Sequence, residues 1–393
     1  MPAPTPWILP AMPPPAATSG DGARPQGLVT FAVEALRERV IVVPTSSADP
    51  RHSVETNSAK RWMRVAIIGL VALATPFIAI IAGPADVTLG QVVGVIASHI
   101  PGIPIEITWN RNIDAIVWTT RLPRSLLALG VGAVLGVSGV VLQAVARNAL
   151  AEPYVLGISS GAGAGCTIAL LVLGISSTTG VGIFAFAGAV GTLAIVVGLT
   201  GRSPNPLRLV LAGLAVGFSL QAVTNLVIFT SGRPEANQAI MFWMLGSLGR
   251  ATWRTALTMV AVAVALTVLL VVCSPLVDAL STGDRTAQGV GVNPGRLRVA
   301  LLVPVSAAVA LAVSFSGAIG FVGLIVPHLM RRWTGHAHRA LVCSSALAGA
   351  GFLTLTDTLG RVVAAPMELP IGVVTGLIGG PFLAYALTKG RLG

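Results

Sequence analysis

Long apolar runs recur along this chain from about residue 65 to about residue 387, and they limit what it can fold into more than any other feature. A run of about 20 apolar residues, coiled as a helix, is long enough to cross about 30 Å of hydrocarbon. Inside a bilayer the backbone must satisfy its own hydrogen bonds, which runs of this length achieve as α-helices. The sequence therefore predicts an all-α, polytopic integral membrane protein.

The scarcity of charged residues excludes a soluble globular protein. Charged side chains make up 10% of the 393 residues, hydrophobic ones make up 54%, and the mean hydropathy is +0.85. A soluble domain has about 25% charged residues, so this chain has too little polar surface to remain in solution. The 45 glycines agree with a helical membrane protein, because small residues let spanning helices pack closely.

The hydropathy pattern predicts ten transmembrane helices. Eight of them are predicted at 65–81, 126–145, 155–173, 181–199, 209–229, 257–273, 341–359 and 371–387. The stretch between Arg298 and Arg331 has no Asp, Glu, Lys or Arg, and as one helix it would extend about 48 Å at about 1.5 Å per residue. Because that length exceeds one crossing, the small residues of 314–320 are predicted to divide it into a seventh span and a shorter eighth.

The first 60 residues differ from the rest, and we predict that they lie outside a ten-helix domain at 61–393. Residues 1–25 are rich in Pro, Ala, Ser and Gly, a composition typical of disorder, although 28–43 have the pattern of a weak amphipathic helix. No basic n-region opens the chain, so we expect no cleaved signal peptide. Ten spans put both termini on one side, and Lys and Arg are more frequent in the segments on that side, which predicts cytoplasmic termini.

The net charge of +11 does not indicate a nucleic-acid-binding protein, because the basic residues form short clusters between apolar runs. The three cysteines are far apart in the sequence: Cys166, Cys273 and Cys343. Without a CxxC pair they are interpreted as structural thiols, and neither a disulfide framework nor a zinc site is predicted. His336 and His338 neighbour Arg331 and Arg339, whose charge disfavours a bound cation, so we predict no metal site.

The chain has no phosphate-binding loop of the form GxxxxGK followed by Ser or Thr, and its lysines are Lys60 and Lys389. We therefore predict that it binds no ATP or Mg²⁺ and that, if ATP drives transport, a separate ATPase holds the nucleotide. The longest polar connection after the sixth span, 276–298, is the predicted contact with that ATPase. Its glycines indicate two short helices, at 279–284 and 287–292, and the alternative is an ordinary interhelical loop.

Three blocks of sequence resemble a known family. The first reads Ser-Gly-Ala-Ile-Gly-Phe-Val-Gly-Leu at 316–324 and is followed by Pro327, His328 and Arg331. The second, 350–370, contains Asp357, Arg361 and Glu368-Leu369-Pro370, and the third is Arg121-Leu122-Pro123-Arg124. Over 67–387 the chain resembles the FecCD-like permease subunits of bacterial ABC importers, which carry iron–siderophore chelates, haem or cobalamin.

The resemblance implies a type II ABC importer permease fold, with two protomers, identical or related, enclosing a pathway through the cytoplasmic membrane. An extracytoplasmic substrate-binding protein would deliver a metal chelate, and a pair of ATPase subunits would dock on the cytoplasmic side. Among the family's substrates we expect an iron–siderophore chelate first, because it is the commonest, with haem and cobalamin as alternatives.

The resemblance also implies roles for individual residues. Docking of the binding protein is implied for Arg121, Arg124 and Arg361. Contact with the ATPase is implied for Gly283, Asp284, Ala287, Gly289 and Gly291. A place in the pathway or its gate is implied for Asn205, Pro206, Leu207, Gly317, Gly320 and Gly323. Structural roles are implied for Pro327, His328, Asp357, Glu368 and Pro370.

Alternatives stand beside these roles. Arg121 and Arg124 are also placed to anchor a helix end among lipid headgroups. Asp357 and Arg361, four apart on one helix face, are placed to form an ion pair. An ion-coupled secondary transporter would need acidic or polar ion ligands in broken helices near the midplane, for which only Asp357 qualifies. An intramembrane enzyme would need a nucleophile–base pair or paired carboxylates, which the predicted spans lack.

Overall fold

The computed structural model describes residues 50–83, 85–102, 106–201, 205–289 and 291–388, and this part of the chain is helical without any strand. The predicted all-α fold is confirmed. The expectation of a disordered extension falls mostly on residues 1–49, which lie outside the described residues. Its last part, 50–60, is helical, because the first described helix already begins at Pro50.

Most helices are joined by short connections. In chain order they begin with α2 (Pro50–Ile81), α3 (Leu89–Ser98), α4 (Arg111–Asp114), the π-helical turns η1 (Ala115–Arg121), α5 (Leu122–Ala146), the 3₁₀ turn η2 (Pro153–Leu156), α6 (Ile158–Thr167), the π-helical turn η3 (Ile168–Val172), α7 (Thr178–Thr200) and α8 (Pro206–Ser231). They continue with α9 (Pro234–Met244), α10 (Trp253–Val272), α11 (Ser274–Thr282), α12 (Asp284–Gly289), α13 (Pro294–Ser316), α14 (Val322–Thr334), α15 (His338–Val363) and α16 (Ile371–Thr388).

A helix occupies each of the predicted spans. Seven helices in the described ranges are long and apolar enough to cross a membrane. The third, eighth and tenth predicted spans correspond to shorter helices, namely α6 with η3, α14 and α16. The predicted division at 314–320 is confirmed, since α13 ends at Ser316 and α14 begins at Val322. Helices α3, α4 and α9 and the π-helical turns η1 were not predicted.

Polar residues define where many of these helices begin. Each of five side chains accepts a hydrogen bond from a backbone N–H in the first turn of the helix that it precedes: Thr88, Ser177, Asn205, Thr252 and Asn293. Such caps satisfy donors that the helix itself cannot pair. In a chain this poor in polar residues, these five caps mark where five of its helices begin.

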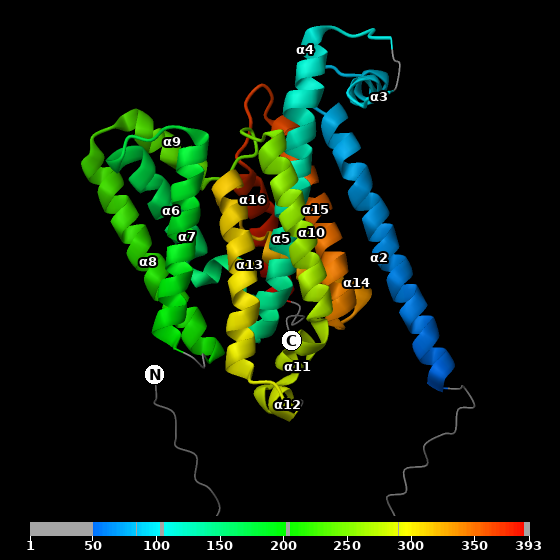
Figure 1. Cartoon of the computed structure of the whole chain (residues 1–393), viewed down its shortest axis with the longest axis vertical. Helices are drawn as coiled ribbons and strands as arrows, with labels where there is room; N and C mark the ends of the chain where they lie inside the picture. Colours follow the sequence, from blue (N-terminus) through cyan, green and yellow to red (C-terminus); the bar gives the residue numbers. More distant parts are fainter. Residues whose placement is uncertain (1–49, 84, 103–105, 202–204, 290, 389–393) are drawn as a thin grey trace, which may run out of the picture. The chain divides into compact units, whose positions relative to one another are not determined.

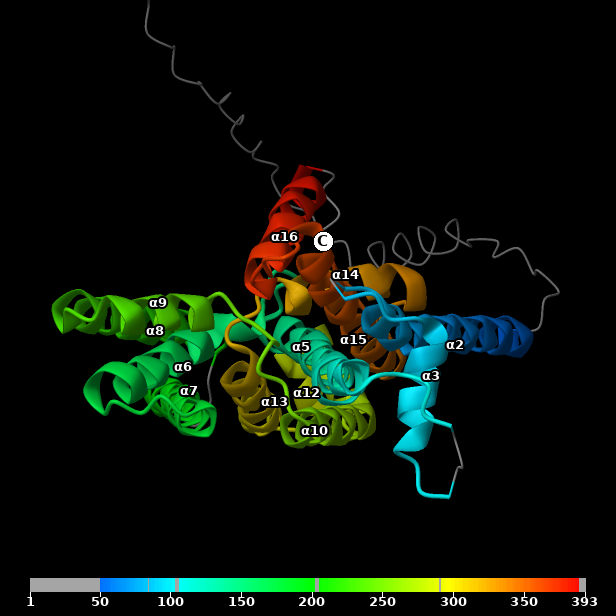
Figure 2. The same ribbon diagram turned by 90° about the horizontal axis from the view of Figure 1, so that it is seen from above.

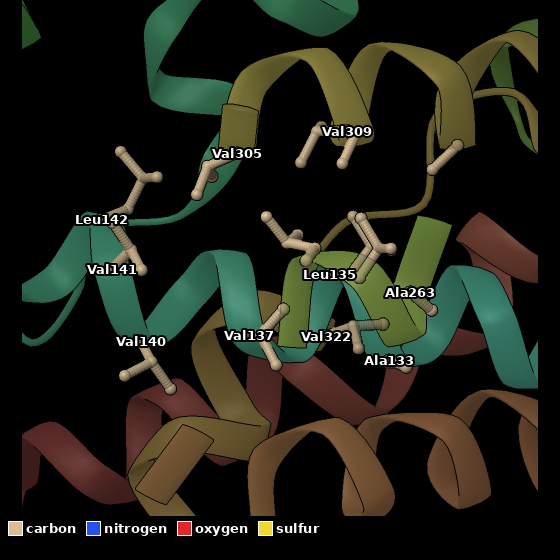
Figure 3. Close-up of a cluster of buried hydrophobic side chains, with 14 of the residues drawn as sticks. Ala133, Leu135, Val137, Val140, Val141, Leu142, Ala263, Val305, Val309 and Val322 are labelled. Atoms are coloured by element: carbon tan, nitrogen blue, oxygen red, sulfur yellow. The ribbon is translucent and has the colours of Figure 1, made fainter. Parts of the chain in front are cut away.

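Helix α5 lies at the centre of the bundle, with α10, α13, α14 and α15 packed around it (Figures 1 and 2). A Cβ added at Gly132 would lie 2.2 Å from the Gly349 carbonyl oxygen of α15, and one at Gly139 would lie 1.9 Å from that of Gly323 in α14. The backbones therefore touch directly at these glycines. Figure 3 shows branched side chains that fill the rest of this core, among them Leu135, Val137, Val305, Val309 and Val322.

The bundle has two ends that carry different elements. One end carries α11 and α12, and the opposite end carries α3, α4 and α9 (Figure 1). We refer to them as the α11/α12 end and the α3/α9 end. Seen from above, α2 lies on one side of the central helices and α6 to α9 form a group on the other (Figure 2).

Candidate functional site

The predicted contact loop at 276–298 contains two short helices at the α11/α12 end, but the second, predicted at 287–292, lies three residues earlier, at 284–289. Helices α11 and α12 are separated by Gly283, whose φ of 143° lies where side chains are disfavoured. Helix α11 begins earlier than predicted, at Ser274, because Pro275 is well suited to the first turn of a helix. Figure 1 shows α12 at the tip of this end, beyond the end of α13.

Asp284 at the start of α12 is held between arginines of two other helices. Its carboxylate accepts a hydrogen bond from Arg298 Nη2 of α13 at 2.5 Å, and another from Arg147 Nη2 at the end of α5. Partial burial acts to raise the pKa of Asp284, but the hydrogen bond and charge of Arg298, together with those of Arg147, outweigh it and hold the pKa below its usual range. The ionised carboxylate therefore ties α12 to α5 and α13.

A second acidic residue of the loop connects it to α15. Asp278 of α11 accepts a hydrogen bond from the His338 backbone N–H at 3.2 Å, and its Oδ1 lies 2.6 Å from His338 Nδ1. The residue before α15, Ala337, has no side chain that caps this helix. Asp278 thus supplies from α11 the cap that α15 lacks. Sequence reasoning missed this contact, because nothing local marks residues so far apart as partners.

The predicted gate residues lie beside the same loop. The Asn205 side chain accepts a hydrogen bond from the Leu207 N–H at 2.9 Å and so starts α8. A polar cavity of about 380 Å³ opens next to it, lined in part by Arg147, Asn205, Pro206, Asp284, Gln288, Asn293 and Arg298. The structure therefore brings predicted gate residues and predicted ATPase-contact residues to one site. The Leu207 side chain does not line this cavity and is exposed.

The predicted ATPase-contact residues differ in accessibility. Gly289 and Gly291 are exposed, and a Cβ at either would meet no atom within 4 Å. Gly291 also has a φ of 79°, which favours glycine. Ala287 is fully buried on the inner face of α12. The prediction of a direct partner contact is therefore wrong for Ala287, because its methyl group packs inside this chain.

The break between α13 and α14 is held by the segment that follows α5. The Tyr154 hydroxyl accepts a hydrogen bond from the Ile319 N–H at 3.0 Å, and Glu152 accepts one from the Phe321 N–H at 3.4 Å. Phe321 has a φ of 69°, a conformation uncommon outside glycine. A broken helix leaves backbone donors that need partners inside a membrane protein. Glu152 and Tyr154 supply two of these partners, and sequence reasoning missed both.

The glycines of the break serve packing. A Cβ at Gly317, whose φ is 69°, would lie 2.1 Å from the Trp243 carbonyl oxygen. Gly323 is buried, and its carbonyl oxygen accepts a hydrogen bond from Gln143 Nε2 at 3.2 Å. Gly320 is half-buried near Glu152. The place of these glycines in a substrate pathway stays a prediction.

The three arginines predicted to dock a binding protein lie at the α3/α9 end, where they bond to their own chain. Arg124 Nε and Nη2 donate to Asp357 at 2.9 to 3.1 Å, and Arg124 Nη1 donates to Glu368 at 2.8 Å. Arg361 Nη2 donates to the Ala79 carbonyl at 2.8 Å, and its Nε lies 3.4 Å from Asp357. These contacts join α5, α15, α2 and the segment before α16.

The third arginine is also engaged internally. Arg121 donates to the carbonyls of Ile80 and Ala85, each at 2.7 Å. Arg121, Arg124 and Arg361 are exposed by only 4, 6 and 5%. The expectation of an exposed docking surface made by these arginines is therefore wrong, because their donors are used to hold helix ends together. The predicted Asp357–Arg361 ion pair is present, with Arg124 as a third member.

The remaining residues predicted to be structural lie at helix contacts. Pro327 is buried within α14, and the His328 ring stands edge-on to Phe382 of α16, with 5.6 Å between ring centroids. Glu368 and Pro370 belong to the segment between α15 and α16, and Glu368 is half-exposed beside Arg124. Across the described ranges, no group of three His, Cys, Asp or Glu residues is arranged to hold a metal ion.

Comparisons with known proteins agree with this architecture. The model of the FecCD transport family matches residues 70–389. The Fe(3+)-citrate import system permease protein YfmD of Bacillus subtilis is 33% identical over 342 residues, which cover 86% of this chain and 98% of that protein. The cobalamin import system permease protein BtuC of Halobacterium salinarum is 40% identical over 72% of this chain and 76% of its own length.

A solved structure supports the same relationship. A transporter assigned to the metal-chelate type of ABC transporter, in an inward-facing conformation, matches with a TM-score of 0.73 and 30% identity. The match covers 83% of this chain and 98% of that one. Together with the family model and the helical membrane architecture, these likenesses identify the chain: it belongs to the FecCD transport family and is a permease subunit of an ABC importer.

Proposed function

We propose that this permease imports a ferric chelate of the iron–siderophore class across the bacterial cytoplasmic membrane. The observation that carries the proposal is the 33% identity with the Fe(3+)-citrate import permease of Bacillus subtilis, which extends over 98% of that protein. The assignment of the matched transporter structure to the metal-chelate type supports the same substrate class.

In this proposal two permease protomers, identical or related, enclose the pathway, and a pair of ATPase subunits docks at the α11/α12 end. ATP and Mg²⁺ bind to the ATPase subunits and not to this chain. Asp284 supports this arrangement, because its bonds to Arg147 and Arg298 connect α12 with α5 and α13. Movement of α12 by an ATPase would be passed through these bonds to the central helix and to the cavity beside Asn205.

A substrate-binding protein docks at the α3/α9 end, which we place on the extracytoplasmic side of the membrane. Both termini then lie on the cytoplasmic side. Four arginines at this end have exposed side chains: Arg111, Arg233, Arg250 and Arg254. They would attract acidic groups on the partner, and the buried cluster of Arg124 and Asp357 fixes the helix ends beneath them. We therefore assign docking of the binding protein to the exposed arginines and not to the buried ones.

Cobalamin is the second candidate substrate. The cobalamin permease of Halobacterium salinarum and the vitamin B12 permease of Escherichia coli O9:H4 are 40% and 38% identical to this chain. These identities exceed that of the ferric citrate permease, but they extend over 72% and 71% of this chain, compared with 86%. The broader coverage leads us to place the ferric chelate first.

Transport in proteoliposomes tests the proposal. Vesicles would contain the permease with its ATPase, and the binding protein would be added outside with radiolabelled ferric siderophore, ferric citrate, haem or cobalamin. We expect ATP-dependent accumulation of ferric chelate and no ATP hydrolysis by the permease alone. Cobalamin uptake without iron uptake would establish the second candidate, and uptake driven by an ion gradient without ATP would contradict both.

A further inference from the structure

An apolar groove runs along the bundle between α2 and α10, and the proposed transport function does not use it. Helices α5 and α15 form its floor, and the groove encloses about 450 Å³. Its walls include Leu73, Leu129, Val260, Val264, Val268 and Leu347. Of the residues that line it, Thr267 is the one with a hydroxyl, and this hydroxyl donates to the Ala263 carbonyl of its own helix. Apart from the Cys343 thiol, the groove therefore offers a ligand only hydrocarbon contacts.

The groove opens towards the hydrocarbon of the membrane. Its walls lie along α2 and α10, two of the helices that are long and apolar enough to span a bilayer. Leu73 on α2 is 66% exposed and Val264 on α10 is 58% exposed, so both rims face outward. Water requires polar partners in such a space, and here it would find none. The groove therefore opens onto the acyl chains of the surrounding lipids.

Aromatic side chains gather where the groove approaches the α3/α9 end. Trp253 begins α10 and lies two helical turns before Val260 on the same helix face. Its ring centroid is 4.6 Å from that of Trp118, which in turn stacks on His99 at 4.0 Å. Tryptophans of membrane proteins concentrate at the headgroup level. The cluster thus marks the height at which the polar part of a lipid lies when its chain enters the groove.

The length of the groove suits one acyl chain. Its wall on α10 runs from Val260 to Val268, about 12 Å at about 1.5 Å per residue. One leaflet contributes about half of the roughly 30 Å hydrocarbon thickness. A chain that descends from the Trp118 and Trp253 level reaches Val260 after about 10 Å and comes level with Val264 after about 16 Å, so it fills the part of the groove that is nearer to the α3/α9 end within its own leaflet. A spanning helix, with a diameter of about 10 Å including side chains, is a bulkier occupant.

Helix α2 is the element that gains most from an occupant. Its close approaches to the bundle lie on the α15 side, where a Cβ at Gly69 would lie 3.3 Å from Leu347 and one at Gly351 would lie 3.4 Å from Ala72. The side of α2 that faces α10 has the groove in place of a neighbouring helix. Figure 2 shows α3 on the same side of α2 as α10.

We propose that this groove is a binding site for one acyl chain of a bilayer phospholipid, which completes the packing of α2 against α10. The headgroup lies at the level of Trp118 and Trp253, and the chain lies against Leu73, Val260 and Val264. The site is independent of the substrate and of the ATPase. It stabilises the permease whether or not transport takes place.

Lipid retention by the full-length chain tests this site. The protein would be washed in detergent, supplied with palmitoyl-oleoyl phosphatidylglycerol and analysed by native mass spectrometry and thermal unfolding. Val264→Trp fills the groove from its exposed rim, and Val260→Trp is a second filling variant. Thr258→Trp is the matched control, because Thr258 is an exposed α10 residue on another face of the helix that does not line the groove. Helicity and elution volume identify any variant that fails to fold.

We expect the wild-type chain and Thr258→Trp to retain one phospholipid and to unfold at a higher temperature as phospholipid is added. Both filling variants should lose the retained lipid and this temperature shift. Equal retention by the filling variants and the wild type, or no retention by the wild type, would overturn the proposal. A disulfide-linked dimer formed by Val264→Cys in membranes would overturn it in favour of a second copy of the chain.

Discussion

Arg124 of α5 and Asp357 of α15 form a buried two-point ion pair, with N–O distances of 2.9 to 3.1 Å. Arg361, one turn further along α15, lies close to the same carboxylate. Glu368 accepts a hydrogen bond from Nη1 of Arg124, the nitrogen that Asp357 does not use. Two guanidinium groups thus share a carboxylate that is 2% exposed. Burying charge is tolerated only when each group keeps its partners. We therefore interpret the cluster as a clamp on three helices and the chain segment before α16.

Asp357→Asn should destabilise the permease strongly. It leaves Arg124 and Arg361 buried without their shared carboxylate, and breaking a buried pair in this way costs about 3–5 kcal/mol. The matched control is Glu368→Gln, because the Glu368 side chain is 48% exposed and should contribute about 1 kcal/mol or less. Thermal unfolding in detergent or nanodiscs measures both. Equal losses in the two variants would contradict the clamp.

The sequence was sufficient to predict the spanning helices but not the contacts of these arginines. Apolar runs predict spans because length and hydropathy are local properties, and the break after Ser316 follows from the same rule. The burial of Arg121 depends on carbonyls at Ile80 and Ala85, on the far side of a loop. Only the Asp357–Arg361 part of the cluster was predictable, because those residues are four apart on one helix. The partners of Arg121 and Arg124 come from packing.

Asp284→Asn should uncouple ATP hydrolysis from transport. The neutral side chain weakens the bonds to Arg147 and Arg298, so α12 no longer transmits its movement to α5 and α13. We expect transport by the assembled importer to fall about tenfold, equivalent to about 1.4 kcal/mol, while hydrolysis continues. Arg285→Gln, a change at the exposed neighbouring residue, is the control. Parallel loss of hydrolysis and transport would indicate failed assembly instead.

Coupling through Asp284 should not depend on pH near neutrality. The pKa of Asp284 lies below its usual range because Arg298 and Arg147 favour the ionised form more than partial burial disfavours it. A lowered pKa means that the stabilisation is fully present above the unfolded value of about 3.9 and is lost as the pH falls through the folded pKa. The ratio of transport to hydrolysis should therefore be flat between about pH 6 and 8 for this group. If the ratio changed with pH in that range in the wild type but not in Asp284→Asn, the prediction would be contradicted.

Two glycines of the loop should respond differently to the same substitution. Gly283→Leu forces a side chain onto a φ of 143°, a strain of about 1–3 kcal/mol, and should disturb the α11–α12 junction itself. Gly289→Leu meets no atom of this chain within 4 Å, so the permease should keep its stability. If the ATPase docks there, Gly289→Leu should still impair assembly, measured by co-purification. Normal co-purification of Gly289→Leu with the ATPase would indicate that the ATPase contacts another part of the permease.

Long-range contacts also account for what the motifs could not predict at the α11/α12 end. Two short helices were predicted there from the glycines, and two are present, although the second covers 284–289 and not the predicted 287–292. Nothing in the local sequence indicates that Asp278 caps α15 at His338, or that Ala287 faces inward. Both follow from how α11 and α12 fold back against the bundle.

Charge reversal at the exposed arginines should slow binding-protein capture. Arg250→Glu with Arg254→Glu places negative charge on the exposed surface at the start of α10. Exposed pairs contribute only about 0.2–1 kcal/mol each, so the main effect should be on the association rate, which falls steeply with salt in the wild type. Arg208→Glu, an exposed change near the start of α8, should leave capture unchanged, because that helix begins beside the cavity of the α11/α12 end. Stopped-flow measurements on permease in nanodiscs at several salt concentrations give the rates. If the double variant kept the wild-type rate and salt dependence, electrostatic attraction by these two arginines would play no part in docking.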